Sequence, residues 1–277
     1  MTPIQDHWSL HARQWPHMGP PLRPCGQDVR MFEDLFASWH TDMALAAPVA
    51  LLLGVTPEIE AMQWPGRTRL LAVDHNLEMI RHVWPGTAGC DSMVICGRWQ
   101  EPPVAPASAH MVIGDGCFTP LPFPEAYIRV AESLHHVLSP EGCLILRFFT
   151  RPPAAQPVSE VLADLEKGKI RSFHAFKWRL AWALHGPSAE DGVCIGDIWQ
   201  AWHTANVDKN RIGRMLGWTP ETMATINNYQ GRTTRYTFPT KDEVRNIFAP
   251  LFKETGCMTG TYELADQCPI FRFSPRI

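Results

Sequence analysis

The chain has 277 residues, with 25 basic and 28 acidic side chains and a formal net charge of −3. Apolar residues make up 45% and charged residues 19%, a composition typical of a folded globular protein rather than a disordered one. The longest apolar run, at 43–55, is interrupted by Pro48 and is shorter than the roughly 18 residues that a membrane-spanning helix needs. We therefore expect no membrane partner, and the near-neutral charge argues against a generally basic nucleic-acid binder.

The N-terminal residues are predicted to form an extended connector followed by a helix. Residues 1–25 are rich in Trp, His and Pro, and the proline-rich stretch at 20–24 restricts each preceding residue to extended conformations. Asp28 is a candidate cap for a helix over about 29–40. Apolar residues recur there at helical spacing, namely Phe32, Leu35, Phe36 and Trp39.

From residue 49 the pattern alternates between strands and helices. Short continuous apolar runs, typical of strands buried on both faces of a parallel sheet, lie at 49–53, 70–73, 93–95, 110–113 and 143–149. Helical candidates lie between them at about 57–63, 76–82 and 125–138. This alternation predicts an α/β fold, a Rossmann-like doubly wound and mostly parallel sheet with right-handed crossovers.

The pattern changes after residue 153. Residues 157–185 and 197–217 are predicted to be amphipathic helices, and Thr240 with Glu243 forms a capping box for a helix of about 241–252. Two closing strands are expected at 256–264 and 268–273. The simplest interpretation is one α/β core, made of 45–153 and 239–277, interrupted by a mostly helical insertion at 154–238.

The loop after the first strand and the end of the second strand are the first candidate site. Ligands of open α/β sheets bind outside the carboxyl ends of the strands. Gly54 follows the first strand, and Asp74 lies twenty residues later at the tip of the second. An acidic residue there can accept hydrogen bonds from both ribose hydroxyls of an adenosine-containing ligand, although Asp also ends strands for turn reasons alone. The spacing from Gly54 favours the ribose role.

The same loop favours one nucleotide over another. A dinucleotide places its pyrophosphate on free N–H groups at a helix N-terminus. Thr56 is a plausible N-cap there, and Pro57 at the first helical position lacks such an N–H, while Glu58 adds a negative charge. GxGxxG is also absent. The loop therefore favours S-adenosylmethionine over NAD.

Five motifs in order resemble those of class I S-adenosylmethionine-dependent methyltransferases. The stretch LLLGVTPEI at 51–59 stands at the family's glycine-rich first motif, although Leu52 replaces its acid and Thr56 replaces a glycine. Asp74 matches the ribose-binding acid. Residues 96–99 fall where the family contacts adenine, 114–118 match the fourth-strand loop that faces the sulfonium and the acceptor, and 138–144 resemble the turn before the fifth strand.

This resemblance implies S-adenosylmethionine as cofactor, S-adenosylhomocysteine as product, and a set of cofactor-binding residues. Trp99 is expected to stack on the adenine face, because Arg98 stands where the family has an acid. The expected set is Gly54, Val55, Thr56, Pro57, Asp74, His75, Met79, Gly97, Arg98, Trp99, Asp115, Gly116 and Phe118.

The acceptor is expected to bind between the N-terminal segment and the insertion. In the resembled family, segments before the first strand often form a lid, so we assign that role to 1–44, with Trp8, Ala12 and Trp15 on its helix; simple packing is the alternative. In the insertion, Trp178 lies on an aromatic stripe that is either a pocket wall or a face buried twice. Tyr229, Arg232 and Arg235 are expected to line the acceptor site, or else to form an exposed loop.

A general base is needed only when the acceptor must lose a proton to become nucleophilic. His174 and His203, on the two predicted helices of the insertion, are the candidate catalytic residues. Transfer by positioning alone, without a base, remains the alternative.

The charge is unevenly distributed along the chain. Residues 167–236 carry 10 basic and 5 acidic side chains, a net of +5, whereas the remainder carries 15 and 23, a net of −8. The function we expect is therefore methyl transfer to a small molecule, with an anionic one favoured by the basic insertion. The alternatives are an RNA- or protein-directed methyltransferase, a NAD(P)-dependent oxidoreductase, or a cofactor-binding protein without catalysis.

The start of the sequence and its cysteines indicate the compartment. No basic-then-apolar leader opens the chain, so no signal peptide is expected. The eight cysteines include no CxxC pair and the twelve histidines no HExxH spacing, so we expect no metal site and a cytoplasmic protein with reduced thiols. The oligomeric state is open, with a homodimer as one option.

Overall fold

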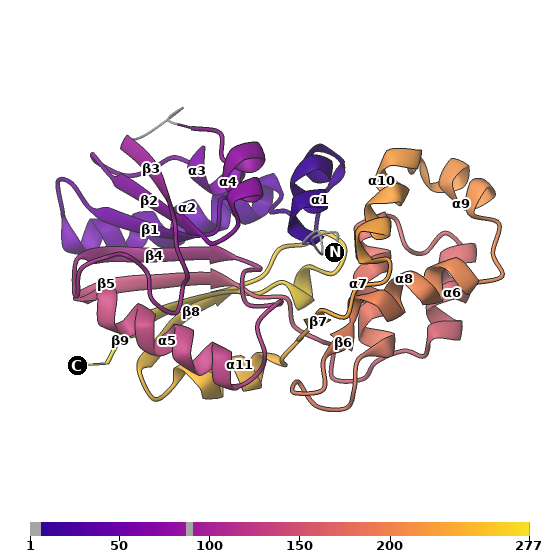
Figure 1. The fold of residues 1–277 in the computed structure, drawn as a ribbon. Coiled ribbons are helices and arrows are strands. Elements are labelled where there is room, and N and C mark those ends of the chain that lie inside the picture. The colour runs from indigo at the N-terminus through magenta and orange to yellow at the C-terminus, as the bar shows by residue number, and fades with distance from the viewer. Residues whose placement is uncertain (1–6, 87–90, 277) are drawn as a thin grey trace, which may run out of the picture.

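A seven-stranded sheet in the order β3-β2-β1-β4-β5-β9-β8 forms the centre of the computed structural model, which describes residues 7–86 and 91–276 (Figure 1). All neighbouring strands run parallel except β9, which is antiparallel to both β5 and β8. The predicted doubly wound, mostly parallel sheet is therefore confirmed. The strands are β1 Val49–Leu53, β2 Arg69–Asp74, β3 Asp91–Cys96, β4 Ala109–Asp115, β5 Leu138–Arg147, β8 Phe252–Met258 and β9 Ile270–Pro275.

The strand register brings the carboxyl ends of the parallel strands to one edge of the sheet. Asp74, the last residue of β2, pairs with Cys96 of β3, and Asp115 of β4 pairs with Arg147 of β5. Leu53 of β1 pairs with Val73 of β2 and Gly114 of β4, one residue before Asp74 and Asp115. The strand order reverses between β1 and β4, and this is the switch point where open α/β sheets bind ligands.

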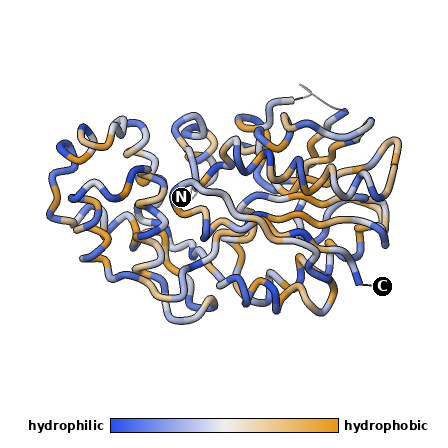
Figure 2. Tube along the Cα trace, turned by 180° about the vertical axis from the view of Figure 1, so that it is seen from behind, coloured by the Kyte–Doolittle hydropathy of each residue, from blue (hydrophilic) through white to orange (hydrophobic). Residues whose placement is uncertain are grey.

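Helices cover both faces of the sheet because successive strand residues point to opposite sides. Ala50 and Leu52 of β1 pack in one cluster with Phe36 of α2 (Gly26–Met43). Leu51 and Leu53 pack on the other side with α5 (Glu125–Val137) and α11 (Lys241–Phe248). The apolar strands therefore lie between two helical layers (Figure 2).

The insertion has a hydrophobic core of its own and lies beside the carboxyl edge of the sheet (Figure 1). Its elements are α6 Val158–Glu166, α7 Phe173–Leu184, α8 Ile195–Thr204, α9 Lys209–Leu216, α10 Pro220–Ala224, the 3-10 turn η2 Thr225–Tyr229 and the antiparallel pair β6 Val193–Cys194 with β7 Arg235–Tyr236. The remaining elements are α1 His7–Gln14, η1 Trp15–His17, α3 Pro57–Glu60, α4 Leu77–Val83 and η3 Ala265–Gln267.

Several predicted boundaries are wrong for local reasons. The segments 157–185 and 197–217 each contain two helices rather than one, and the strand β8 begins four residues earlier than expected because α11 ends at Phe248. Asp28 is not the cap of α2. Cys25 is the N-cap, and the Asp28 carboxylate, three residues later, accepts a hydrogen bond from the Cys25 N–H at 2.8 Å. The β6–β7 pair was not predicted, because two-residue strands leave no periodic signal.

The N-terminal segment has two parts with different positions. The helix α2 packs on the sheet, whereas only the part before it, with α1 and η1, lies over the carboxyl edge (Figure 1). None of the helices in the described segments is long and apolar enough to cross a membrane. Seven cysteines lie in those segments with free thiols, and Cys90 lies outside them.

The core of the insertion contains a buried lysine. Lys177 of α7 is 0% exposed, and its Nζ donates a hydrogen bond to Oγ1 of Thr225 at 3.1 Å. The same Nζ lies 5.5 Å from the ring centroid of Tyr229. Burial lowers the pKa of Lys177 from 10.5 to about 7, since the charged form loses its hydration.

This lysine makes stability depend on pH. Between about pH 7 and 10.5 the unfolded chain binds a proton at Lys177 that the folded protein lacks, so this residue makes the free energy of unfolding rise with pH. We expect Lys177→Met to gain most relative to wild type at pH 7, and this gain to shrink by on the order of 4 kcal/mol by pH 10.5. Chemical denaturation at several pH values measures it. The exposed control Lys167→Met should show a constant difference, and a constant difference for Lys177→Met would contradict the assignment.

Candidate functional site

One cavity opens at the switch point, beneath the N-terminal segment. It has an empty volume of about 800 Å³, open solvent at its mouth included, and it adjoins a second hollow of about 930 Å³. The two share Trp8, Asp74, Met79, Trp99 and Pro120. These dimensions suit a small organic ligand or a nucleoside-sized one.

The first-strand loop forms one wall of the cavity. Gly54 has a φ of +96°, a conformation that favours glycine, and its N–H donates to the carbonyl of Val73 at 2.9 Å. Thr56 is the N-cap residue of α3, as predicted, and Pro57 is at the first helical position. The Thr56 hydroxyl makes no capping hydrogen bond, and the residue lines the cavity instead.

Glu58 does not provide the negative charge expected of it. Its Oε1 accepts a hydrogen bond from Nε of Arg23 at 2.7 Å, so an arginine of the N-terminal segment neutralises the carboxylate. Glu58 would therefore repel a pyrophosphate less than predicted. Pro57 still disfavours a pyrophosphate, since that residue has no N–H to donate.

Asp74 lies at the junction of the cavity and the adjoining hollow. The residue is 7% exposed, and its Oδ1 accepts the N–H of Asn76 at 2.8 Å. Asn76 in turn caps α4. Asp74 therefore stabilises the turn after β2, which was the alternative to a ribose-binding role. It also presents a carboxylate to both hollows.

Trp99 is held rigidly against the strand edge. Its Nε1 donates to the carbonyl of Val73 at 2.7 Å, which fixes the indole where it lines both hollows. His75 and Arg98, both exposed, line the outer hollow with it. Gly97 lies behind them and donates its N–H to the carbonyl of Asp74 at 3.0 Å.

Asp115, the last residue of β4, and Gly116, which follows it, face the cavity from the other side of β1 than Asp74. Gly116 has a φ of +60°, and a Cβ there would come within 2.4 Å of the Phe149 ring, so only glycine fits. Arg147 holds the Asp115 carboxylate from behind with its Nε. Burial raises the pKa of Asp115 to about 6 although Arg147 opposes this, and the nearby carboxylates of Asp28 and Glu58 add to the rise.

Arg147, whose own side chain is fully buried, is the centre of a polar cluster. Its Nη1 donates to Oδ2 of Asp28 at 2.9 Å and to the Tyr262 hydroxyl at 3.0 Å, and its Nη2 donates to the Pro21 carbonyl at 2.9 Å. The Tyr262 hydroxyl donates to Oδ1 of Asp28 at 2.8 Å. One guanidinium thus joins the helix α2, the strand ends of β4 and β5, the N-terminal connector and the C-terminal loop.

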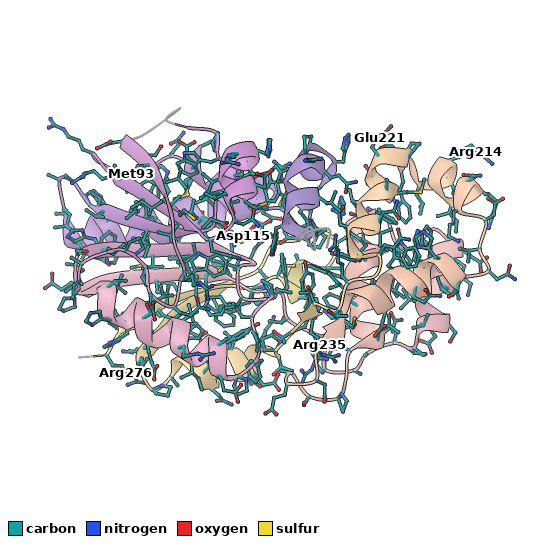
Figure 3. All side chains as sticks on the ribbon, viewed as in Figure 1. Met93, Asp115, Arg214, Glu221, Arg235 and Arg276 are labelled. Atoms are coloured by element: carbon teal, nitrogen blue, oxygen red, sulfur yellow. The ribbon has the colours of Figure 1, made fainter. Side chains whose placement is uncertain are left out.

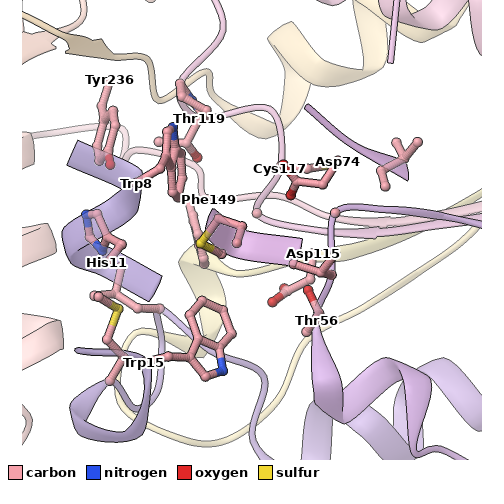
Figure 4. A pocket seen from close by; sticks show the side chains of 18 of the residues that line it. Trp8, His11, Trp15, Thr56, Asp74, Asp115, Cys117, Thr119, Phe149 and Tyr236 are labelled. Atoms are coloured by element: carbon pink, nitrogen blue, oxygen red, sulfur yellow. The ribbon is translucent and has the colours of Figure 1, made fainter. Parts of the chain in front are cut away.

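The N-terminal segment covers the cavity and is anchored on both sides. Trp8, His11 and Trp15 line the cavity from α1 and η1 (Figure 4). Ala12 packs with Met79 of α4 in a separate apolar cluster. On the insertion side, Oγ of Ser172 donates to the Pro20 carbonyl at 2.9 Å. The lid role assigned to Trp8 and Trp15 remains a proposal, and their position over the cavity supports it.

Several predicted site residues lie away from the cavity wall. His174 is 3% exposed, its Nε2 donates to the His17 carbonyl at 3.1 Å, and burial lowers its pKa to about 3, so it remains neutral and anchors the N-terminal segment. His203 is exposed on α8, with its ring stacked 4.0 Å from that of Trp199. Neither histidine lines the cavity, and their predicted role as general bases is corrected accordingly.

The two arginines expected to bind an anionic acceptor are also elsewhere. Arg235 is exposed and donates through Nε to the Asp191 carbonyl at 2.7 Å. Arg232 is half-buried and is not on the cavity wall. Phe118, predicted to contact the cofactor, packs instead in the sheet core, with its ring 5.0 Å from that of Tyr127.

Other lining residues were not predicted. They include His11, Thr119 and Phe149 (Figure 4). His11 follows Trp8 by three positions, so helical spacing alone could have identified it. Phe149 comes to the cavity just after the end of β5, and only the tertiary fold reveals this. Trp15 and Trp178 each contain a buried Nε1 that meets no acceptor among the described residues.

No metal-binding cluster is found in the described segments, where no three His, Cys, Asp or Glu side chains are grouped to hold an ion.

No family model and no curated protein matches the sequence. Solved structures do match its fold. A protein of Rhodobacter sphaeroides described as a candidate Zn-dependent alcohol dehydrogenase matches with a TM-score of 0.58 at 13% identity, over 98% of this chain and 97% of its own. The N-methyltransferase NodS of Bradyrhizobium japonicum WM9, in complex with S-adenosylhomocysteine, matches with a TM-score of 0.52 at 11% identity, over 98% of this chain and 100% of its own.

An S-adenosylmethionine-dependent methyltransferase of Clostridium acetobutylicum ATCC 824 matches with a TM-score of 0.52 at 8% identity, over 89% of this chain and 92% of its own. At such identities the likeness is one of fold. The chain has the Rossmann-like fold of class I methyltransferases, with a helical insertion before the closing strands.

Removing the central guanidinium should destabilise the protein strongly. Arg147→Met leaves the buried carboxylates of Asp28 and Asp115 without a counter-charge, at an expected cost of about 3–5 kcal/mol in the free energy of unfolding at neutral pH. The loss should be smaller at pH 4.5, where the unpaired carboxyls take up protons. Arg69→Met, which breaks an exposed pair with Asp91, is the control and should cost about 1 kcal/mol or less. Equal losses in urea denaturation would contradict the central role of Arg147.

Proposed function

We propose that the protein is an S-adenosylmethionine-dependent methyltransferase that acts on a small-molecule acceptor. One observation carries the proposal: Asp74 and Asp115, on the strands that flank β1, face one cavity whose wall between them is the Gly54–Thr56 loop. A nucleoside with a thioether chain matches this layout. Its ribose diol needs a carboxylate that accepts two hydrogen bonds, and its amino-acid chain needs a loop whose backbone it can approach closely.

We assign each wall of the cavity to the part of the cofactor that it would contact. We assign the ribose hydroxyls to Asp74, the adenine face to Trp99, with His75 and Arg98 at its edge, and the amino-acid chain to Gly54 and Thr56. Asp115 and Gly116 face the sulfonium end.

The chain itself contributes position and a dry environment. When bound, S-adenosylmethionine supplies a methyl group on a sulfonium cation, and such chemistry belongs to the cofactor. The N-terminal segment keeps water from the cavity through Trp8 and Trp15, and the rigid strand ends fix the direction in which an acceptor approaches. The Asp115 carboxylate, held by Arg147, places negative charge near the cationic sulfur.

The position of the cavity favours a small acceptor over RNA or protein. It lies beneath the N-terminal segment and is lined mostly by aromatic and apolar residues. The surplus positive charge of the insertion lies elsewhere. Arg214 is at the outer end of the insertion and Arg235 points to its surface (Figure 3). A polyanion bound to these arginines would lie on the surface of the insertion, away from the cavity that Asp115 lines.

We expect Asp74→Ala to weaken binding of S-adenosylhomocysteine at least tenfold, because each hydrogen bond to a charged group contributes about 1.5–3 kcal/mol. Isothermal titration calorimetry measures it. The control is Asp242→Asn, whose side chain is 85% exposed and does not line the cavity, and this variant should bind with the affinity of wild type. Unchanged affinity in Asp74→Ala would remove the ribose assignment.

The oxidoreductase alternative is tested in the same calorimeter. NADH and NADPH are titrated beside S-adenosylmethionine, and only the latter should bind, because Pro57 offers no N–H to a pyrophosphate. Binding of a nicotinamide dinucleotide without binding of S-adenosylmethionine would replace the proposed function with that alternative.

A further inference from the structure

The inner part of the cavity is walled by an unbroken chain of aromatic rings. Each ring lies within 5.3–6.0 Å of the next, centroid to centroid. We call this group the aromatic chamber, and its members in order are Phe149, Trp178, Tyr236, Tyr229, His11 and Trp8. They come from the N-terminal segment, the end of β5 and three elements of the insertion, so the chamber exists only where these parts meet (Figure 4).

The charges that face the cavity are all negative. Asp74 and Asp115 are its charged lining residues, and no Lys or Arg of the described segments lines it. Arg147 lies behind Asp115, fully buried and paired. Lys177 packs behind the Tyr229 ring, outside the cavity, and burial reduces its charge at neutral pH. An anionic acceptor therefore finds no counter-charge in the chamber among residues 7–86 and 91–276.

A cation finds two kinds of partner in the same place. The faces of Trp and Tyr rings attract ammonium groups through their quadrupole, most strongly where water is excluded. Asp115 offers a carboxylate oxygen beside the chamber. With Asp74 assigned to the ribose, Asp115 is the charged lining residue that remains for the acceptor.

From this geometry we propose that the aromatic chamber selects an amine as the methyl acceptor, so that the transfer forms an N-methyl group. The inference rests on the proposed function and replaces the anionic acceptor that the sequence favoured. The bound ammonium first gives one proton to the Asp115 carboxylate, and the neutral nitrogen then donates its lone pair to the methyl carbon while the bond from that carbon to sulfur breaks. The bonding pair stays on sulfur, which becomes a neutral thioether, and the product leaves as an N-methylammonium ion.

Three probes that share a phenyl ring and a two-carbon chain test the charge preference: 2-phenylethylamine, 2-phenylethanol and 3-phenylpropionate. Each is titrated calorimetrically into the wild-type protein, with and without saturating S-adenosylhomocysteine. We expect the amine to bind at least tenfold more tightly than the alcohol, and the acid to bind most weakly. Equal or tighter binding of the acid, or binding of none of the three, overturns the proposal.

A variant of the N-terminal segment separates cation recognition from simple apolar contact. Trp8→Leu keeps apolar area but removes the ring face, and Trp8 is only partly buried, so the fold should persist. We expect the amine-to-alcohol affinity ratio to fall about fivefold or more, with Trp8→Phe intermediate. Trp199→Leu, in the insertion but off the cavity wall, should leave the ratio unchanged. An unchanged ratio in Trp8→Leu contradicts the proposal.

The design distinguishes this proposal from the function on which it rests. If S-adenosylhomocysteine fails to bind, the proposed methyl transfer fails, while the probe titrations without it still report whether the chamber prefers amines. If S-adenosylhomocysteine binds and the amine preference is absent, the cofactor assignment survives and the amine acceptor does not.

Discussion

The buried guanidinium of Arg147 connects the parts of the chain that build the site. It binds two carboxylates, those of Asp28 and Asp115, together with the Pro21 carbonyl and the Tyr262 hydroxyl. These partners come from the helix on one face of the sheet, a strand end, the N-terminal connector and the C-terminal loop. A buried charge is costly unless it is paired and hydrogen-bonded, so the four segments must come together for any of them to be stable there.

This constraint explains why Asp115 and a group of aromatic rings line the same cavity. Two carboxylates face one guanidinium, and this cluster holds Asp115 in place at the cavity wall, while burial raises the pKa of its carboxyl to about 6. The same cluster holds the connector, and with it α1, over the switch point. The His11 ring of α1 then lies 5.8 Å from that of Tyr229 in the insertion, and an aromatic chamber forms beside a carboxylate.

The parts of the fold that follow from local pattern were predictable, and those that depend on long-range contacts were not. The apolar runs gave the parallel strands, and Gly54 with Asp74 indicated the edge where the cavity opens. The sequence offered no sign that Asp28 pairs with a residue 119 positions away, or that Arg235 bonds to a backbone carbonyl instead of facing the cavity. A count of charges along the insertion could not reveal in which direction they point.

The account is tested most directly by a crystal structure of the protein with S-adenosylhomocysteine. We predict the ribose hydroxyls within hydrogen-bond distance of Asp74, the adenine against Trp99, and the sulfur beside Asp115 with its former methyl direction pointing into the aromatic chamber. Density for the nucleoside outside this cavity, or a ribose that does not contact Asp74, would contradict it.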